Sequence, residues 1–266
     1  KRSRRKDNPE ARMSIGDHLR ELRQRLFVSA AGVMVMTVVG YLVYERAFAL
    51  ITRPIEQANA KGAHLTLNFD TILASFDMKL EVSIWLGILF SSPLWIYEFW
   101  AFVGPGMTRK EKAYTWAYGT AGLFLFLAGA ALGIWVMPHA VAILTSFIPN
   151  GPTAGVIGAN LYLSFIMRMV LAFGIAFLLP EVLVALNMLG LMQGKTMLKG
   201  WRWAIVGIVT FMAIVNPMPD PWSMIFMSVP IAGLYFLACF ISIRHDKRVE
   251  KKRAELDAEL EAALAE

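Results

Sequence analysis

Long apolar stretches, separated by short polar segments, run through most of the chain. Crossing about 30 Å of hydrocarbon takes about 20 apolar helical residues. Six stretches bounded by charges or helix breakers are candidate spans, at about residues 26–44, 73–103, 113–137, 161–189, 201–215 and 222–243. The pattern therefore predicts an all-α, polytopic membrane protein with six transmembrane helices.

The lengths of these stretches vary. Residues 73–103 and 161–189 are long, so we expect them to tilt or to project beyond the bilayer. Residues 201–215 would cover only about 22 Å at 1.5 Å per residue, unless the helix continues through Leu198. The expected architecture is a kinked bundle with shortened last helices, in which four prolines kink or end their helices: Pro93, Pro138, Pro180 and Pro230.

Lys and Arg concentrate in alternate polar segments. Nine lie in residues 1–25, and the loops 104–112 and 190–202 and the tail 244–266 hold three, three and six. On the opposite side, residues 45–72 hold three, whereas 138–160 and 216–221 hold none. The positive-inside rule then predicts that both termini are cytoplasmic.

The same pattern divides the chain into three parts. Residues 1–25 form a cytoplasmic N-terminal segment, residues 26–243 a six-helix transmembrane domain, and residues 244–266 a charged cytoplasmic tail. In the tail, acids and bases alternate at helical spacing, which predicts a solvated helix. Lys79 and Arg168 fall near the outer ends of their spans, where we expect the side chains to snorkel to the interface.

Composition narrows the function. The chain is 57% hydrophobic and 17% charged with a formal net charge of +6, which excludes a disordered chain and an ordinary soluble domain. Its single cysteine, Cys239, excludes an intramolecular disulfide. The four histidines lie in loops or rims without metal-ligand spacing, and no phosphate-binding loop is present. We therefore expect no catalytic site, no metal, no cofactor and no nucleic-acid partner.

Two acids lie in strongly basic cytoplasmic segments. Glu21 precedes the first span and Glu111 precedes the third. Each either forms a local salt bridge, as Glu21 would with Arg25 at i, i+4, or binds a cationic ligand. The residues alone leave both interpretations open.

Other acids lie in or next to apolar runs. An ionised acid at the bilayer centre costs about 2.5–3.5 kcal/mol on insertion scales, so we expect Glu98 and Glu181 to face protein or a wet cavity. Asp220 follows Asn216 in an outer turn, where Asp220 would cap the last helix. Asn216 and Asp220 are thus candidates for a structural turn or a partner contact.

Taken together, the motifs resemble the TatC family, the polytopic core of the twin-arginine protein translocase, over nearly the whole chain. The motifs, in chain order, are His18-Leu-x-Glu21-Leu22-Arg23-x-Arg25, Pro54 in the first outer loop, Pro93, Trp100-Ala101-Phe102-x-x-Pro105-Gly106-x-x-x-x-Glu111, Ser164-Phe165, Phe173-Gly174-x-x-Phe177-x-x-Pro180 and Asp220-Pro221. Their order along six spans is specific to the family.

The resemblance implies a receptor for signal peptides that carry an arginine pair and an apolar stretch, on cargo exported already folded. Glu21 and Glu111 would receive the pair, and the same motifs supply the other candidate binding residues: His18, Leu22, Arg23, Phe102 and Pro105. The resemblance also implies single-span partners, TatA and TatB, movement driven by the proton-motive force, and a possible homo-oligomer.

Two positions depart from the family pattern. Leu178 stands where family members commonly have glutamate, and Glu181 lies one turn further along the same helix. Glu98 stands where other members have glutamine. An alternative function is a proton-coupled small-molecule permease with Glu98 and Glu181 as relay groups. Such permeases usually contain internal repeats, and none is detected between residues 1–137 and 138–266.

Overall fold

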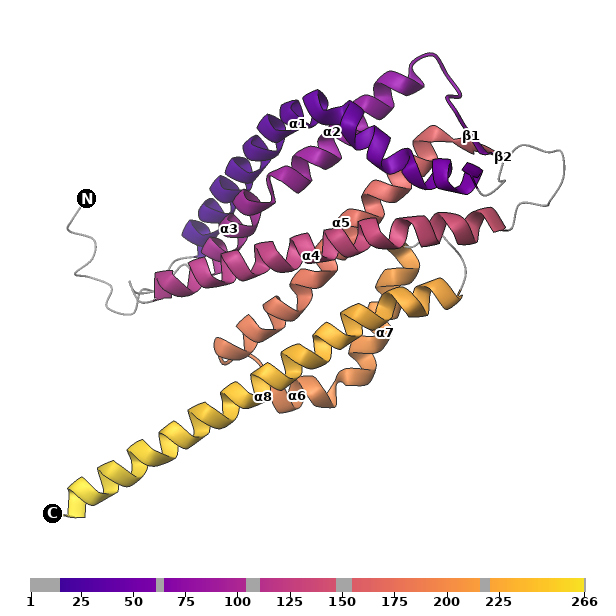
Figure 1. Ribbon diagram of the computed structural model, residues 1–266. Coiled ribbons are helices and arrows are strands. Elements are labelled where there is room, and N and C mark those ends of the chain that lie inside the picture. Colours follow the sequence, from indigo (N-terminus) through magenta and orange to yellow (C-terminus); the bar gives the residue numbers. More distant parts are fainter. Residues whose placement is uncertain (1–14, 61–64, 104–110, 147–154, 216–220, 266) are drawn as a thin grey trace. The chain divides into compact units, whose positions relative to one another are not determined.

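The computed structural model describes residues 15–60, 65–103, 111–146, 155–215 and 221–265 (Figure 1). The chain divides into two compact units, Lys1–Leu171 and Ala172–Glu266. The described residues are almost entirely helical, so the all-α class is confirmed. Each unit is described by itself below.

In the first unit, one long helix packs on a shorter, bent pair. Helix α1 (Ile15–Ala60) packs against α2 (Ala74–Phe90) and α3 (Ser92–Val103), and α3 packs in turn on α4 (Glu111–Ser146). The helices α1 and α2 approach closely at Gly40, because a Cβ there would lie 2.6 Å from the Ser83 carbonyl oxygen. Glycine is therefore required for this helix pair.

The second predicted span is not a single tilted helix. It breaks into α2 and α3, which are bent by 53°. The last backbone bond of α2 runs from the Ser91 N–H to the Gly87 carbonyl oxygen at 3.0 Å. Pro93, which lacks an N–H, lies in the first turn of α3, where a helix tolerates it. Residues 73–103 are thus divided between two helices that meet at a bend.

Helix α1 extends further than its apolar stretch. It continues to Ala60 and contains Pro54, which the sequence placed in a loop. In the last turn of α1, the Asn59 side-chain amide donates to the Leu65 carbonyl oxygen at 2.9 Å and accepts from the Leu65 N–H at 2.8 Å. These bonds tie the helix end to strand β1 (Leu65–Asn68), which pairs in parallel with β2 (Gly155–Gly158). The hydrophobic pattern did not predict this small sheet.

In the second unit, helix α6 (Gly194–Lys199) is followed by α7 (Trp201–Val215) and α8 (Pro221–Ala265). Helix α7 does not continue back through Leu198, because the Gly200 N–H bonds to the carbonyl oxygens of Thr196 and Met197 and closes α6. The short helix predicted for residues 201–215 is therefore confirmed. Helix α8 joins the last predicted span to an exposed helical tail.

Three of the four predicted helix breakers lie inside helices. Pro138 lies inside α4, Pro180 inside α5 (Ala159–Met188) and Pro230 inside α8, and none of these helices ends there. Of the four predicted breakers, Pro93 adjoins a break in the backbone.

The membrane spans follow from length and composition. Within the described ranges, α1, α4, α5 and α8 each contain a stretch that is long and apolar enough to cross a bilayer. The bent pair of α2 and α3 makes a fifth candidate, and α7 is apolar but has 15 residues. The chain is thus a multi-pass membrane protein, and the described helices account for all six predicted apolar stretches.

Candidate functional site

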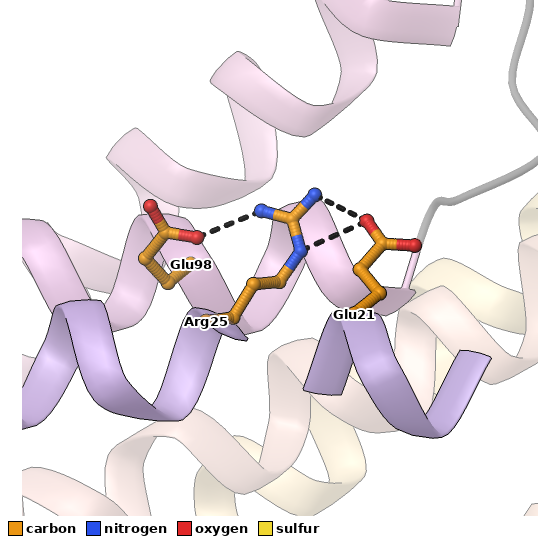
Figure 2. Close-up of polar contacts among 3 residues, drawn as sticks. All are labelled: Glu21, Arg25 and Glu98. Atoms are coloured by element: carbon orange, nitrogen blue, oxygen red, sulfur yellow. Dashed lines mark hydrogen bonds and ion pairs between the residues drawn. The ribbon is translucent and has the colours of Figure 1, made fainter. Parts of the chain in front are cut away.

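An arginine lies between two carboxylates where α1 faces α3 (Figure 2). The Arg25 Nε and Nη2 atoms both donate to Glu21 Oε1, at 3.0 and 2.6 Å. On its other side, Arg25 Nη1 donates to Glu98 Oε2 at 2.7 Å. We call Glu21, Arg25 and Glu98 the acid–arginine cluster. The ion pair between Glu21 and Arg25, four residues apart on α1, is the salt bridge that was one of the two interpretations of Glu21.

The cluster is shielded but reachable. The side chains of Arg25, Glu21 and Glu98 are 25%, 21% and 15% exposed. Glu21 Oε2 is covered from solvent and has no hydrogen-bond partner among the described residues. The cluster thus presents carboxylate oxygens that accept hydrogen bonds from a cationic group, and Arg25 is the group that they hold in this structure.

Helices α1 and α3 also bring together two aromatic residues that were predicted to bind the signal peptide. The rings of His18 and Phe102 stack with centroids 4.4 Å apart and planes 18° from parallel. His18 lies about one turn before Glu21, and Phe102 about one turn after Glu98. The stack thus extends the contact between the two helices beside the cluster.

The remaining predicted binding residues are placed only in part. Leu22 and Arg23 are exposed on α1. Glu111 is the first residue of α4, and its side chain is outside the description. Pro105, Asn216 and Asp220 lie outside the described residues.

Glu98 and Glu181 fall in different units of the chain. Glu98 meets the expectation that it faces protein, because it binds Arg25. Glu181 is buried in α5, 6% exposed. Among the described residues, no group of three or more His, Cys, Asp or Glu is arranged to hold a metal ion.

Sequence reasoning overlooked Glu81, an acid inside the apolar stretch 73–103. Glu81 lies on α2, where its Oε1 accepts a hydrogen bond from Ser164 Oγ at 2.6 Å and one from Trp85 Nε1 at 3.4 Å. The available signal was the one used for Glu98, an acid inside the apolar stretch 73–103. Glu81 therefore joins α2 to α5 within the first unit.

Lys79, which we expected to extend toward the membrane interface, also contacts residues of α1. Its Nζ lies 3.6 Å from Glu45 Oε1 and 4.6 Å from the centroid of the Tyr41 ring. Lys79 is thus held by α1 through an ion pair and a cation–π contact.

Known proteins resemble the chain over most of its length. The model of the family TatC, described as Sec-independent protein translocase protein, matches residues 17–230. A protein of Xylanimonas cellulosilytica named Sec-independent protein translocase protein TatC is 43% identical over 244 residues, which cover 91% of this chain and 88% of that protein. A protein of the same name from Rothia mucilaginosa is 36% identical over 254 residues, 95% of this chain and 86% of that protein.

The fold agrees with these matches. A crystal structure of the twin-arginine translocase receptor TatC, in the detergent DDM, superposes with a TM-score of 0.74 at 26% identity, covering 85% of this chain and 99% of that one. The sequence matches and the fold lead to one conclusion: the chain belongs to the TatC family of Sec-independent protein translocase proteins.

Proposed function

We propose that this protein is the signal-peptide receptor and assembly core of a twin-arginine translocase, which exports folded proteins across the cytoplasmic membrane using the proton-motive force. Its role is binding and not catalysis. Both termini are cytoplasmic, and its partners are the single-span subunits TatA and TatB, the bilayer and possible further copies of itself. Family membership supports this proposal, and the acid–arginine cluster carries it.

The cluster supports recognition of arginine in particular. Glu21 and Glu98 together hold one guanidinium through three hydrogen bonds. A planar guanidinium offers five donors in a fixed fork, whereas a lysine ammonium is a compact point charge. Two carboxylates that already hold the guanidinium of Arg25 are therefore suited to an arginine of a signal peptide.

Apolar surface next to the cluster suits the rest of such a peptide. Leu19, Leu22 and Leu26 are 59%, 41% and 66% exposed on α1. The apolar stretch that follows an arginine pair would lie against such side chains. Glu111, at the start of α4, is the second acid that we propose to receive the arginine pair.

Simple arithmetic suggests a modest affinity. A hydrogen bond to a charged group contributes about 1.5–3 kcal/mol. Two such contacts and an apolar segment reach the range of about 8 kcal/mol that corresponds to micromolar binding. The cytoplasmic segments are rich in Lys and Arg, so non-specific attraction of a cationic peptide contributes little. Binding would be reversible and would depend on a few acids.

Photo-crosslinking in native membranes tests the proposal. A twin-arginine signal peptide and its twin-lysine variant are offered to the wild type, to Glu21→Gln and to Glu111→Gln. We expect selective capture of the arginine peptide, lost in both variants. The matched control is Glu259→Gln, which removes an acid from the exposed tail and should capture the peptide as the wild type does. Equal capture of both peptides, insensitive to either substitution, would refute the receptor function.

The permease alternative gains no support from the described residues. Glu98, one of its two relay groups, is engaged by Arg25. A cavity of about 310 Å³ in the first unit is lined by apolar side chains of α1, α2, α4 and α5, with Arg46 as the charged exception. Such a lining does not form the polar path that a small polar substrate requires.

A further inference from the structure

In the acid–arginine cluster, the protein's own Arg25 occupies the carboxylates that would receive an arginine of the signal peptide (Figure 2). Two of its nitrogens donate to Glu21 Oε1 and a third donates to Glu98 Oε2. One oxygen of each acid is thus already used by a guanidinium from the same chain.

This occupancy limits how a second guanidinium can bind. The strongest arginine–carboxylate pairing is bidentate, with parallel N–H groups on both carboxylate oxygens. While Arg25 holds Oε1 of Glu21, only Oε2 remains, and that atom is covered from solvent. A bidentate pair between Glu21 and a signal peptide therefore requires Arg25 to release its oxygen.

Arg25 is able to leave. Its side chain is 25% exposed, and its long stem can carry the guanidinium into water. The exchange replaces one guanidinium by another, so the charge of the cluster and the kind of bonds stay the same. Replacement of like by like makes binding reversible.

We propose that Arg25 is a built-in competitor that occupies the arginine position of the resting receptor, and that Glu98 is a second carboxylate of this position. The inference rests on the proposed receptor function and adds to it an internal control of binding affinity. A peptide arginine reproduces the bonds of Arg25, whereas a peptide lysine makes a point-charge contact. Arg25 lowers the apparent affinity of both by the same factor, because either one must first displace the same side chain. The preference for arginine then comes from the two carboxylates, and Arg25 sets how tightly the position binds.

The test is the binding of labelled twin-arginine and twin-lysine signal peptides to the full-length protein in lipid nanodiscs at pH 8. In Arg25→Gln, we expect the twin-arginine peptide to bind about tenfold more tightly, the effect of about one charge-assisted contact. The twin-lysine peptide should gain by a similar factor, because both peptides displace the same side chain, so the preference for arginine stays unchanged. Unchanged or weaker binding of the twin-arginine peptide would overturn the inference.

Three further variants sharpen the result. Arg20→Gln makes the same charge change on an exposed position of α1 and should shift neither affinity. Arg25→Lys keeps the charge without the fork, so the gain should be smaller than in Arg25→Gln. Adding Glu98→Gln to Arg25→Gln should reverse the gain, whereas a retained gain would remove Glu98 from the position.

The outcome separates this inference from the proposed function. If wild type binds both peptides equally and Glu21→Gln changes nothing, the receptor function itself fails. If wild type prefers arginine through Glu21 but Arg25→Gln brings no gain, only the competitor role of Arg25 fails. Thermal unfolding of each variant in the same nanodiscs confirms that binding is compared between folded proteins.

Discussion

At the scale of residues, one half of the acid–arginine cluster is local and the other half is not. Glu21 and Arg25 are four residues apart on one helix, so their ion pair follows from helical geometry. Arg25 and Glu98 are 73 residues apart and meet only because α3 packs on α1. The sequence left two interpretations of Glu21 open, a salt bridge with Arg25 or the binding of a cationic ligand. The two do not exclude each other, because the carboxylate in the salt bridge is the one that we propose to bind the signal peptide.

A second polar cluster lies in the second unit, where Asp246 of α8 holds the turn between α5 and α6. Its Oδ1 accepts from Asn187 Nδ2 at 2.8 Å, and its Oδ2 accepts from the Gly194 N–H at 2.7 Å. Both bonds go to an ionisable carboxylate, and Asn187 is itself buried. Asp246 therefore stabilises the chain reversal that leads into α6.

We expect Asp246→Ala to lower the free energy of unfolding by about 1.5–3 kcal/mol, the range for hydrogen bonds to charged groups. Thermal unfolding of the purified protein, followed by near-ultraviolet circular dichroism, would show a lower Tm. The matched control is Asp257→Ala on the exposed tail, which should change the stability by less than about 0.5 kcal/mol. Equal Tm values for the two variants would contradict this role.

At the scale of elements, the pairing of α1 with α2 depends on the absence of side chains. Gly40 of α1 faces the Ser83 carbonyl oxygen, and Gly87 of α2 faces Thr37. Small residues at helix contacts in membranes let the two backbones approach and pack. The glycines thus set the distance between the helices that carry Glu21 and Arg25 on one side and lead to Glu98 on the other.

Gly40→Ala should therefore destabilise the protein although alanine favours helix. Overpacking costs about 1–3 kcal/mol, against a helix-propensity gain of up to about 1 kcal/mol. Gly207→Ala in α7 is the control, because a Cβ there meets no atom within 4 Å. Unfolding in detergent should show a lower Tm for the first variant only. A Gly40→Ala protein as stable as the control would show that the helices separate without cost.

Element boundaries were predicted best where a polar residue or a glycine breaks the pattern. Helix α7 begins and ends where its apolar stretch does, because Gly200 closes the preceding turn. The bend between α2 and α3 was less accessible, since the stretch 73–103 is apolar on both sides of Ser91. There, the hydrophobic pattern indicates burial in lipid or protein, but it does not indicate where the helix axis changes direction.

At the scale of the whole molecule, the distribution of Lys and Arg predicts which segments face the cytoplasm. The tail 244–266 is basic near the membrane, with six Lys and Arg, whereas the segment 138–160 has none. Transfer of basic loops across a membrane is disfavoured, which is the basis of the positive-inside rule. The predicted topology therefore places these two segments on opposite sides.

Cysteine labelling checks this topology. In a Cys239→Ala background, we expect an impermeant maleimide to label Asn150→Cys in intact cells and Ala258→Cys in inverted membrane vesicles only. The native Cys239 is buried, so its removal serves to silence background labelling. Labelling of Ala258→Cys from outside intact cells would reverse the orientation and remove Glu21 from the cytoplasmic face.

The sequence by itself determined the membrane class, the all-α fold, the six apolar stretches and the family. These features depend on composition and on the local spacing of apolar residues. Both can be read from the sequence without knowing which residues pack together. The helical tail belongs to the same group, because the spacing of its acids and bases is a local signal. The short α7 does not, because the sequence also allowed this helix to continue through Leu198 and the structure decided between the two.

Only the tertiary structure decided which polar groups meet. The contacts of Arg25 with Glu98, of Ser164 with Glu81 and of Asp246 with Asn187 each join residues 59 or more positions apart. A polar group in apolar surroundings costs free energy unless it forms a hydrogen bond. Many different partners could supply that bond, so the sequence does not identify the one that is used. The helix packing selects the partner, and in doing so it places a guanidinium of the chain itself on the acids of the candidate site.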